Sequence, residues 1–410
     1  MRSICLFAAL ATIAGAAHAA PLTYEAALKL ADDTAPSLQA KAADVRAARS
    51  SAIAAGRLPD PTISVEATDF PISGPLAGRP DLDNFSMVTL GVSQEVPSGA
   101  KRRSERAVAA TVISEAEAQR LVELRRVRIA AGLAWIDLYY AKRRLAALDK
   151  IEEALASMRR SAPAQLASGA ERPSQTVEPE QLTAALADRR AELVAAVGMA
   201  RAELGRWIDG AQADEPAGDA PGETIDPIAL RANLDYLPQL RVKAAAIDHA
   251  DADADLAKAA KRPDWSFGLD YSHRDPRFGD YVSAKVTMSL PIFGSTRQDP
   301  LIAARLEGVN RAIADQRQTR RDLEAALESD LAGHAMHHER LQRAREALVP
   351  LAKRRVELET ASYAAGTASL SDVLRAVLTL AEAVTDDLDR EADVARDGAR
   401  IVLTYGVDPQ

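Results

Sequence analysis

Two regions of the chain alternate apolar and polar residues with the two-residue period of a β-strand. They cover residues 62–96 and 265–293, and each contains a turn rich in Pro, Gly and Asp. In the second region, one face carries large apolar side chains only, namely Trp265, Phe267, Leu269 and Tyr271. We predict a β-hairpin in each region, with strands over residues 265–273 and 281–290 in the second.

The apolar faces of these hairpins have two explanations. One is a soluble sheet packed on helices. The other is a set of outer-membrane strands, about 9–11 residues long, with apolar side chains towards lipid. Trp265 and Tyr271 lie at the ends of the apolar row, as in an aromatic girdle. Since a small barrel needs about eight strands, four strands per chain imply a barrel that several chains share.

Outside the hairpins, the pattern predicts helices of unusual length. The longest stretches are residues 101–166 and 298–364, and the first would span roughly 100 Å at 1.5 Å per residue. Pro350 is expected to kink the second stretch or break it locally. Such helices need partner helices along their length, as in a coiled coil or a helical barrel.

The chain also repeats itself. Ala27-Leu28 is matched by Ala229-Leu230, an offset of 202 residues, and Pro-Asp and Gly positions recur in the same order. Each half reads as helix, hairpin, long helix and last helix, and in the second half the first helix is expected over about 227–262 and the last over 369–405. We expect a first repeat over residues 20–210 with its hairpin at 62–96, a linker at 211–227, and a second repeat over 228–410 with its hairpin at 265–291.

The first 19 residues resemble a cleaved secretory signal, with an apolar stretch that ends at Ala17-His18-Ala19. The single cysteine, Cys5, lies inside it, so the mature chain would have no disulfide, no thiol nucleophile and no lipid-bearing cysteine. No later apolar run approaches a transmembrane helix. If the mature protein enters a membrane, it must do so as a β-barrel.

Composition and charge narrow the classes of function. The chain has 51 basic and 59 acidic residues, a net charge of −8, and an acidic chain is a poor nucleic-acid binder. No nucleophile–base arrangement, phosphate loop or zinc motif is present, so we expect neither an enzyme nor a cofactor. A mid-helix cluster of His334, His337 and His338 is a weak metal candidate, and solvated side chains are the simpler interpretation.

Three motifs give this order of elements a family likeness. They are Val92–Arg102 after the first hairpin, Ser289–Gly294 after the second, and Tyr363–Leu374 between the last two helices. The chain resembles the TolC family of outer membrane efflux proteins, and the Gln94–Arg102 segment is most similar to its heavy-metal branch. The resemblance implies a mainly helical fold with a small β part, a homotrimer with a 12-stranded barrel in outer-membrane lipid, and a long periplasmic helical barrel. It also implies a periplasmic membrane-fusion adaptor and an inner-membrane resistance-nodulation-division pump as partners.

The resemblance further suggests which residues matter. Asp372 falls on the position of an aspartate ring at the periplasmic tip, where carboxylates would select cations, and Arg375 replaces the family's second aspartate. The turns at Ser168-Gly169 and Gly366-Thr367 would face the adaptor. A local interpretation of Asp372 stays open, because an acid in the first turn of a helix also complements the helix dipole.

We therefore expect an outer-membrane exit duct for heavy-metal cations. A duct of the same fold for drugs or for type I protein export, and a soluble periplasmic coiled-coil scaffold, are the alternatives.

Overall fold

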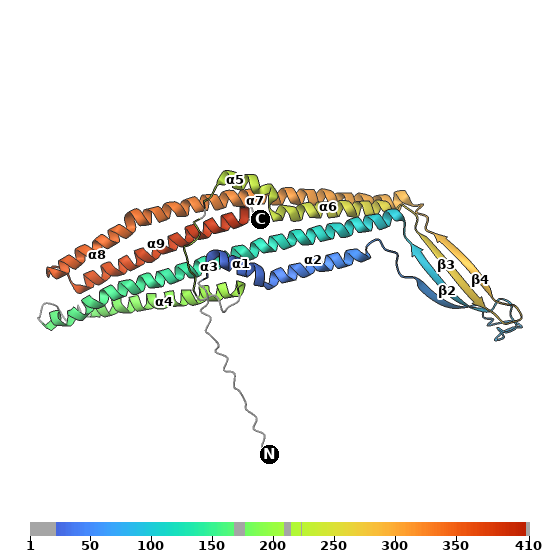
Figure 1. Cartoon of the computed structure of the whole chain (residues 1–410), viewed down its shortest axis with the longest axis horizontal. Coiled ribbons are helices and arrows are strands. Elements are labelled where there is room, and N and C mark those ends of the chain that lie inside the picture. Colours follow the sequence, from blue (N-terminus) through green and yellow to red (C-terminus); the bar gives the residue numbers. More distant parts are fainter. Residues whose placement is uncertain (1–21, 168–176, 209–214, 223, 407–410) are drawn as a thin grey trace, which may run out of the picture. The chain divides into compact units, whose positions relative to one another are not determined.

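The computed structural model describes residues 22–208, 215–222 and 224–406, apart from 168–176. It consists of helices and one small antiparallel sheet (Figure 1). The expected signal peptide at residues 1–19 and the tip residues Ser168 and Gly169 lie outside the described part. Among the described helices, none is both long and apolar enough to cross a membrane.

The chain divides into two compact units, and each unit takes segments from both sequence halves. Unit 1 contains Met1–Ala35, Val127–Ile225 and Asp330–Thr404, and unit 2 contains Pro36–Arg126, Asp226–Ser329 and Tyr405–Gln410. The helix–hairpin–helix order nevertheless occurs once in each half of the chain. The repeat boundaries at 20–210 and 228–410 stay a prediction about duplication and do not describe compact bodies.

The sheet belongs to unit 2 and contains four strands in the order β1-β2-β3-β4. The strands are β1 (Thr62–Thr68), β2 (Met87–Val96), β3 (Trp265–His273) and β4 (Tyr281–Met288). All neighbours are antiparallel, and β2 pairs with β3, which joins the two hairpins into one sheet (Figure 1). Strand β3 covers its predicted range, and β4 ends two residues before the predicted end at Leu290.

The helices of unit 2 are α2 (Pro36–Ala54), the first part of α3 (Gly99–Ala167), α5 (Pro227–Asn233), α6 (Pro238–Ala259) and most of α7 (Asp299–Arg343). The stretch expected as one helix over 227–262 is split, with a short 3₁₀ turn, η3 (Leu234–Tyr236), between α5 and α6. Pro238 explains the split. Proline cannot donate a backbone hydrogen bond inside a helix, but it is well placed in the first turn of a new one.

One carboxylate in unit 2 connects the start of helix α3 with the start of strand β3. An oxygen of Asp264, next to the start of β3, accepts the backbone N–H of Ser98 at 2.7 Å, and its second oxygen lies 3.3 Å from the Lys101 ammonium. Both partners lie at the start of α3. The Asp264 carboxylate therefore stabilises the N-terminus of the long helix while fixing the entry of the second hairpin.

Unit 1 contains α1 (Tyr24–Thr34), the rest of α3, α4 (Val177–Trp207), the end of α7, α8 (Val349–Ala364) and α9 (Leu370–Tyr405). One of its apolar clusters is formed by α3, α4 and α9, with the buried side chains Leu148, Leu186, Leu193, Leu370, Val373, Leu374, Val377 and Ala381. Figure 1 shows α8 and α9 running alongside each other. The expected local break at Pro350 is present as a π-helical turn, η5 (Ala344–Leu348), directly before α8.

Candidate functional site

The turn between α8 and α9 is built by Gly366. Its φ of 74° lies in the left-handed region, which a residue with a Cβ rarely adopts. The N–H of Gly366 donates to the carbonyl of Tyr363 at 3.0 Å, and the N–H of Thr367 donates to that of Ser362 at 2.9 Å. The turn thus satisfies the last carbonyls of α8 and reverses the chain within a few residues. Gly366 and Thr367 are exposed.

The next helix starts with a reciprocal cap between Ser369 and Asp372. The Ser369 hydroxyl oxygen accepts the N–H of Asp372 at 3.2 Å, and the Asp372 carboxylate accepts the N–H of Ser369 at 3.0 Å and its hydroxyl at 2.7 Å. These bonds, together with the charge of Arg375, hold the pKa of Asp372 below its usual value. Asp372 is therefore ionised at neutral pH and has a local role in capping α9.

Arg375 lies one turn further along α9. Its guanidinium is 3.2 Å from the second oxygen of Asp372, within the same helix. The opposite face of α9 is packed, because Val373 and Leu374 are almost completely buried. The side chains of Asp372 and Arg375 are 37% and 51% exposed, so the charged pair lies on the solvent-exposed side of the first turns of α9.

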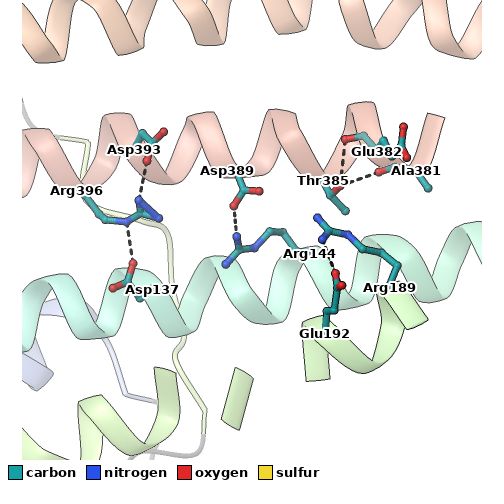
Figure 2. A network of polar contacts seen from close by, with 10 residues as sticks. All are labelled: Asp137, Arg144, Arg189, Glu192, Ala381, Glu382, Thr385, Asp389, Asp393 and Arg396. Atoms are coloured by element: carbon teal, nitrogen blue, oxygen red, sulfur yellow. Dashed lines mark hydrogen bonds and ion pairs between the residues drawn. The ribbon is translucent and has the colours of Figure 1, made fainter. Parts of the chain in front are cut away.

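A network of charges aligns α9 with α3 further from the turn (Figure 2). Arg396 on α9 bridges Asp137 on α3 and Asp393 on its own helix, at 2.7 Å each. Arg144 on α3 pairs with Asp389 on α9. Because a guanidinium fork binds carboxylates in a fixed geometry, these pairs set the axial position of α9 against α3. Within unit 1, they thereby position the start of α9.

The sheet separates apolar from polar side chains. The register aligns Ile63, Val92, Leu269 and Ala284 across the four strands, and it aligns Val65, Leu90, Tyr271 and Val282 in the next such row. This face is open: Ile63 and Val65 are each 73% exposed, and Leu269 is 57% exposed. Trp265, Phe267 and Tyr271 are exposed as well. The other face carries small and polar residues, such as Ser64, Gly91, Asp270 and Ser283.

The histidine cluster lies on α7 and differs from the expected solvated row. The Nδ1 of His337 is 2.6 Å from an oxygen of Asp397 on α9, whose side chain is only 8% exposed. His334 is partly buried, and His338 is exposed. The described residues contain no group of three or more His, Asp or Glu side chains able to hold an ion.

Sequence reasoning missed the charge network of Figure 2 and the His337–Asp397 pair. The partners are far apart in the chain: Arg144 and Asp389 are separated by 245 residues, and His337 and Asp397 by 60. Helices with charged faces contain many such residues. Nothing in their local spacing distinguishes the charges that meet from those that are solvated.

The fold is that of bacterial outer-membrane channels. A membrane protein from Pseudomonas aeruginosa superposes with a TM-score of 0.79 at 18% identity, covering 93% of this chain and 90% of that one. The CmeC outer membrane channel from Campylobacter jejuni gives 0.74 at 14%, covering 93% and 85%. CusC, whose structures describe transmembrane channel formation, gives 0.77 at 14%, covering 93% and 92%.

Sequence comparison finds a family match in the second half of the chain. Residues 230–407 match the family model described as outer membrane efflux protein. No curated protein matches the chain in sequence. The family match covers residues 230–407, and the shared fold agrees with the likeness to the TolC family that the motifs suggest.

Proposed function

We propose that the chain is the outer-membrane exit duct of a tripartite efflux system. The observation that carries the proposal is the open apolar face of the four-stranded sheet, in a chain whose residues 230–407 match the efflux family. A row of exposed Ile, Val, Leu and aromatic side chains is costly in water and favourable in lipid. The polar face with Ser64, Asp270 and Ser283 would then line an aqueous lumen.

The proposed assembly is a homotrimer. β1 and β4 are the two ends of the sheet order, so each has one edge without a strand partner in the described chain. Open edges in a bilayer would leave backbone groups unpaired, which lipid does not tolerate. Pairing of β4 with β1 of the next chain would close three sheets into a 12-stranded barrel, with the helices forming the periplasmic extension.

The proposed cargo is a heavy-metal cation, delivered by an inner-membrane resistance-nodulation-division pump through a periplasmic adaptor. The support is the likeness of the segment from Gln94 to Arg102 to the heavy-metal branch. In this proposal the turns at Ser168-Gly169 and Gly366-Thr367 contact the adaptor. The charged pair of Asp372 and Arg375 would contribute to the tip gate, where threefold symmetry would repeat each charge.

Cell fractionation tests the location of the duct. The chain is expected in the outer-membrane fraction and should require detergent for extraction. Recovery as a freely soluble periplasmic protein would refute the duct and favour the coiled-coil scaffold.

The cargo is tested separately by deleting the gene and measuring tolerance to zinc, cobalt, cadmium, copper and organic toxins. Unchanged metal tolerance with lost toxin tolerance would point to the drug duct.

The gate is tested by single-channel recording in planar bilayers. Asp372→Asn removes the charge and weakens the cap, whereas Ser369→Ala weakens the cap and keeps the charge. The proposal predicts altered conductance or altered block by divalent cations in Asp372→Asn and no such change in Ser369→Ala. Equal behaviour of the two variants would leave Asp372 with its capping role alone.

A further inference from the structure

Two histidines on α7 lie one helical turn apart with their rings facing the same region. The ring centroids of His334 and His338 are 6.1 Å apart, with an angle of 65° between the ring planes. Residues separated by four positions project from the same face of a helix. Neither imidazole makes a hydrogen bond or an ion pair with any residue that the structure describes.

The neighbouring charges are already engaged elsewhere. His337 is bonded to Asp397, whose other oxygen accepts from Arg400 at 3.0 Å, and Arg400 also lies 3.1 Å from Asp330. The carboxylates of Asp397 and Asp330 thus already have partners in Arg400 and His337. The free nitrogens of His334 and His338 are left as the available ligands on this face.

Burial favours the neutral form of the His334 imidazole. Burial lowers the pKa of His334, so this ring is neutral at neutral pH. A neutral imidazole nitrogen is the form that ligates a metal ion. The Nδ1 of His334 is enclosed without a partner, which leaves Nε2 as its ligand atom.

The distance between the rings is close to that of a metal-bound pair. Two imidazoles on one tetrahedral zinc ion, with Zn–N bonds of about 2.0–2.1 Å, have ring centroids about 5 Å apart. The observed 6.1 Å exceeds this by about one ångström. Because the side chain of His338 is exposed, a small rotation of that side chain can close the difference.

We propose that His334 and His338 form a two-imidazole chelate for a borderline divalent cation such as Zn²⁺, Ni²⁺ or Cu²⁺. No third protein ligand is provided by the described residues, so water completes the coordination and the ion exchanges readily. The site is formed by one chain. It does not depend on the proposed duct, and its failure would leave the duct untouched.

Calorimetric titration of the purified full chain, carrying no histidine tag and in excess Mg²⁺, tests the site with Zn²⁺ and Ni²⁺ as probes. The unmodified protein is expected to bind one ion per chain. His338→Gln should weaken binding about tenfold or more, as the loss of a metal ligand or its support typically does. His273→Gln removes an exposed imidazole from strand β3 of unit 2, and this variant should bind as the unmodified protein does.

Two results would overturn the chelate. One is no saturable binding by the unmodified protein. The other is equal affinity of His338→Gln and His273→Gln, which would assign the binding to scattered surface groups. Since His338 is exposed, its substitution should leave the fold intact, and an unchanged circular dichroism spectrum verifies this. If the spectrum does change, His338→Asn removes the same imidazole with a shorter side chain and is measured in its place.

Discussion

Trp135 is the residue on which the packing around α1 depends. Its ring is completely buried, stacks on Tyr139 at 5.1 Å, and meets Tyr24 edge-on at 5.7 Å. Its indole N–H donates to the carbonyl of Leu22 at 2.8 Å, so the polar atom of a buried aromatic ring is satisfied. This bond ties the first described residue of unit 1 to the middle of α3.

Replacing Trp135 by Phe should destabilise the protein by about 1–3 kcal/mol, because the Leu22 carbonyl keeps only the N–H of Ala217 as a donor and a cavity is left. The matched control is Trp207→Phe. The Trp207 N–H bonds to Glu203 at the surface of α4, so its loss should cost much less. Thermal unfolding followed by circular dichroism measures both, and equal midpoints would contradict the assigned role of Trp135.

Single-residue roles were only partly predictable. The open apolar side chains Trp265, Phe267, Leu269 and Tyr271 follow from alternation alone, because a strand places every second residue on one face. Asp372 stands out by its motif, and the structure shows it in the local capping role that the sequence left open. The pairing of His337 with Asp397 was unpredictable, since it depends on the axial position of α9 against α7.

At the scale of elements, the α8–α9 turn should depend on the left-handed conformation of Gly366. Gly366→Ala forces a Cβ into the left-handed conformation and should destabilise the turn by about 1–2 kcal/mol. Gly333→Ala is the control, because Gly333 lies inside α7 with open space around it and Ala should stabilise a helix there by up to about 1 kcal/mol. Opposite shifts in the unfolding midpoint are expected. Shifts of the same sign would show that Gly366 is not conformationally required.

A second prediction at the scale of elements concerns the two faces of the sheet. Leu269→Arg places a charge on the open apolar face and should cost about 2–4 kcal/mol if that face is at the bilayer midplane. Ser283→Arg adds the same charge to the opposite face of the neighbouring strand. The yield of detergent-extracted protein in the outer-membrane fraction is the measurement. We expect a loss for Leu269→Arg only, and equal losses would contradict the assignment of one face to lipid and the other to the lumen.

Elements were more predictable than single residues, because their signals are local. Alternation predicted β3 from Trp265 to His273, and long apolar–polar periodicity predicted α3 and α9 to within a few residues. The errors came from proline and from 3₁₀ geometry. The stretch over 227–262 is divided at Pro238, whereas the sequence alone suggested one helix.

At the scale of the whole molecule, neither the sequence pattern nor the fold of a single chain determines how many chains assemble. The duplication suggested two consecutive repeats, but each compact unit combines segments from both halves. Local signals cannot reveal this arrangement, because it arises when helices from the two halves pack side by side. The trimer is argued from the open edges of β1 and β4 and from the exposed apolar face.

The mass of the detergent-extracted protein tests the trimeric duct most directly. The protein is solubilised from outer membranes in mild detergent, and its mass is determined by native mass spectrometry. We expect a complex of three chains, held by pairing of β4 with β1 between neighbours. A monomer obtained from the periplasm without detergent, with its apolar sheet face covered by another protein, would contradict it.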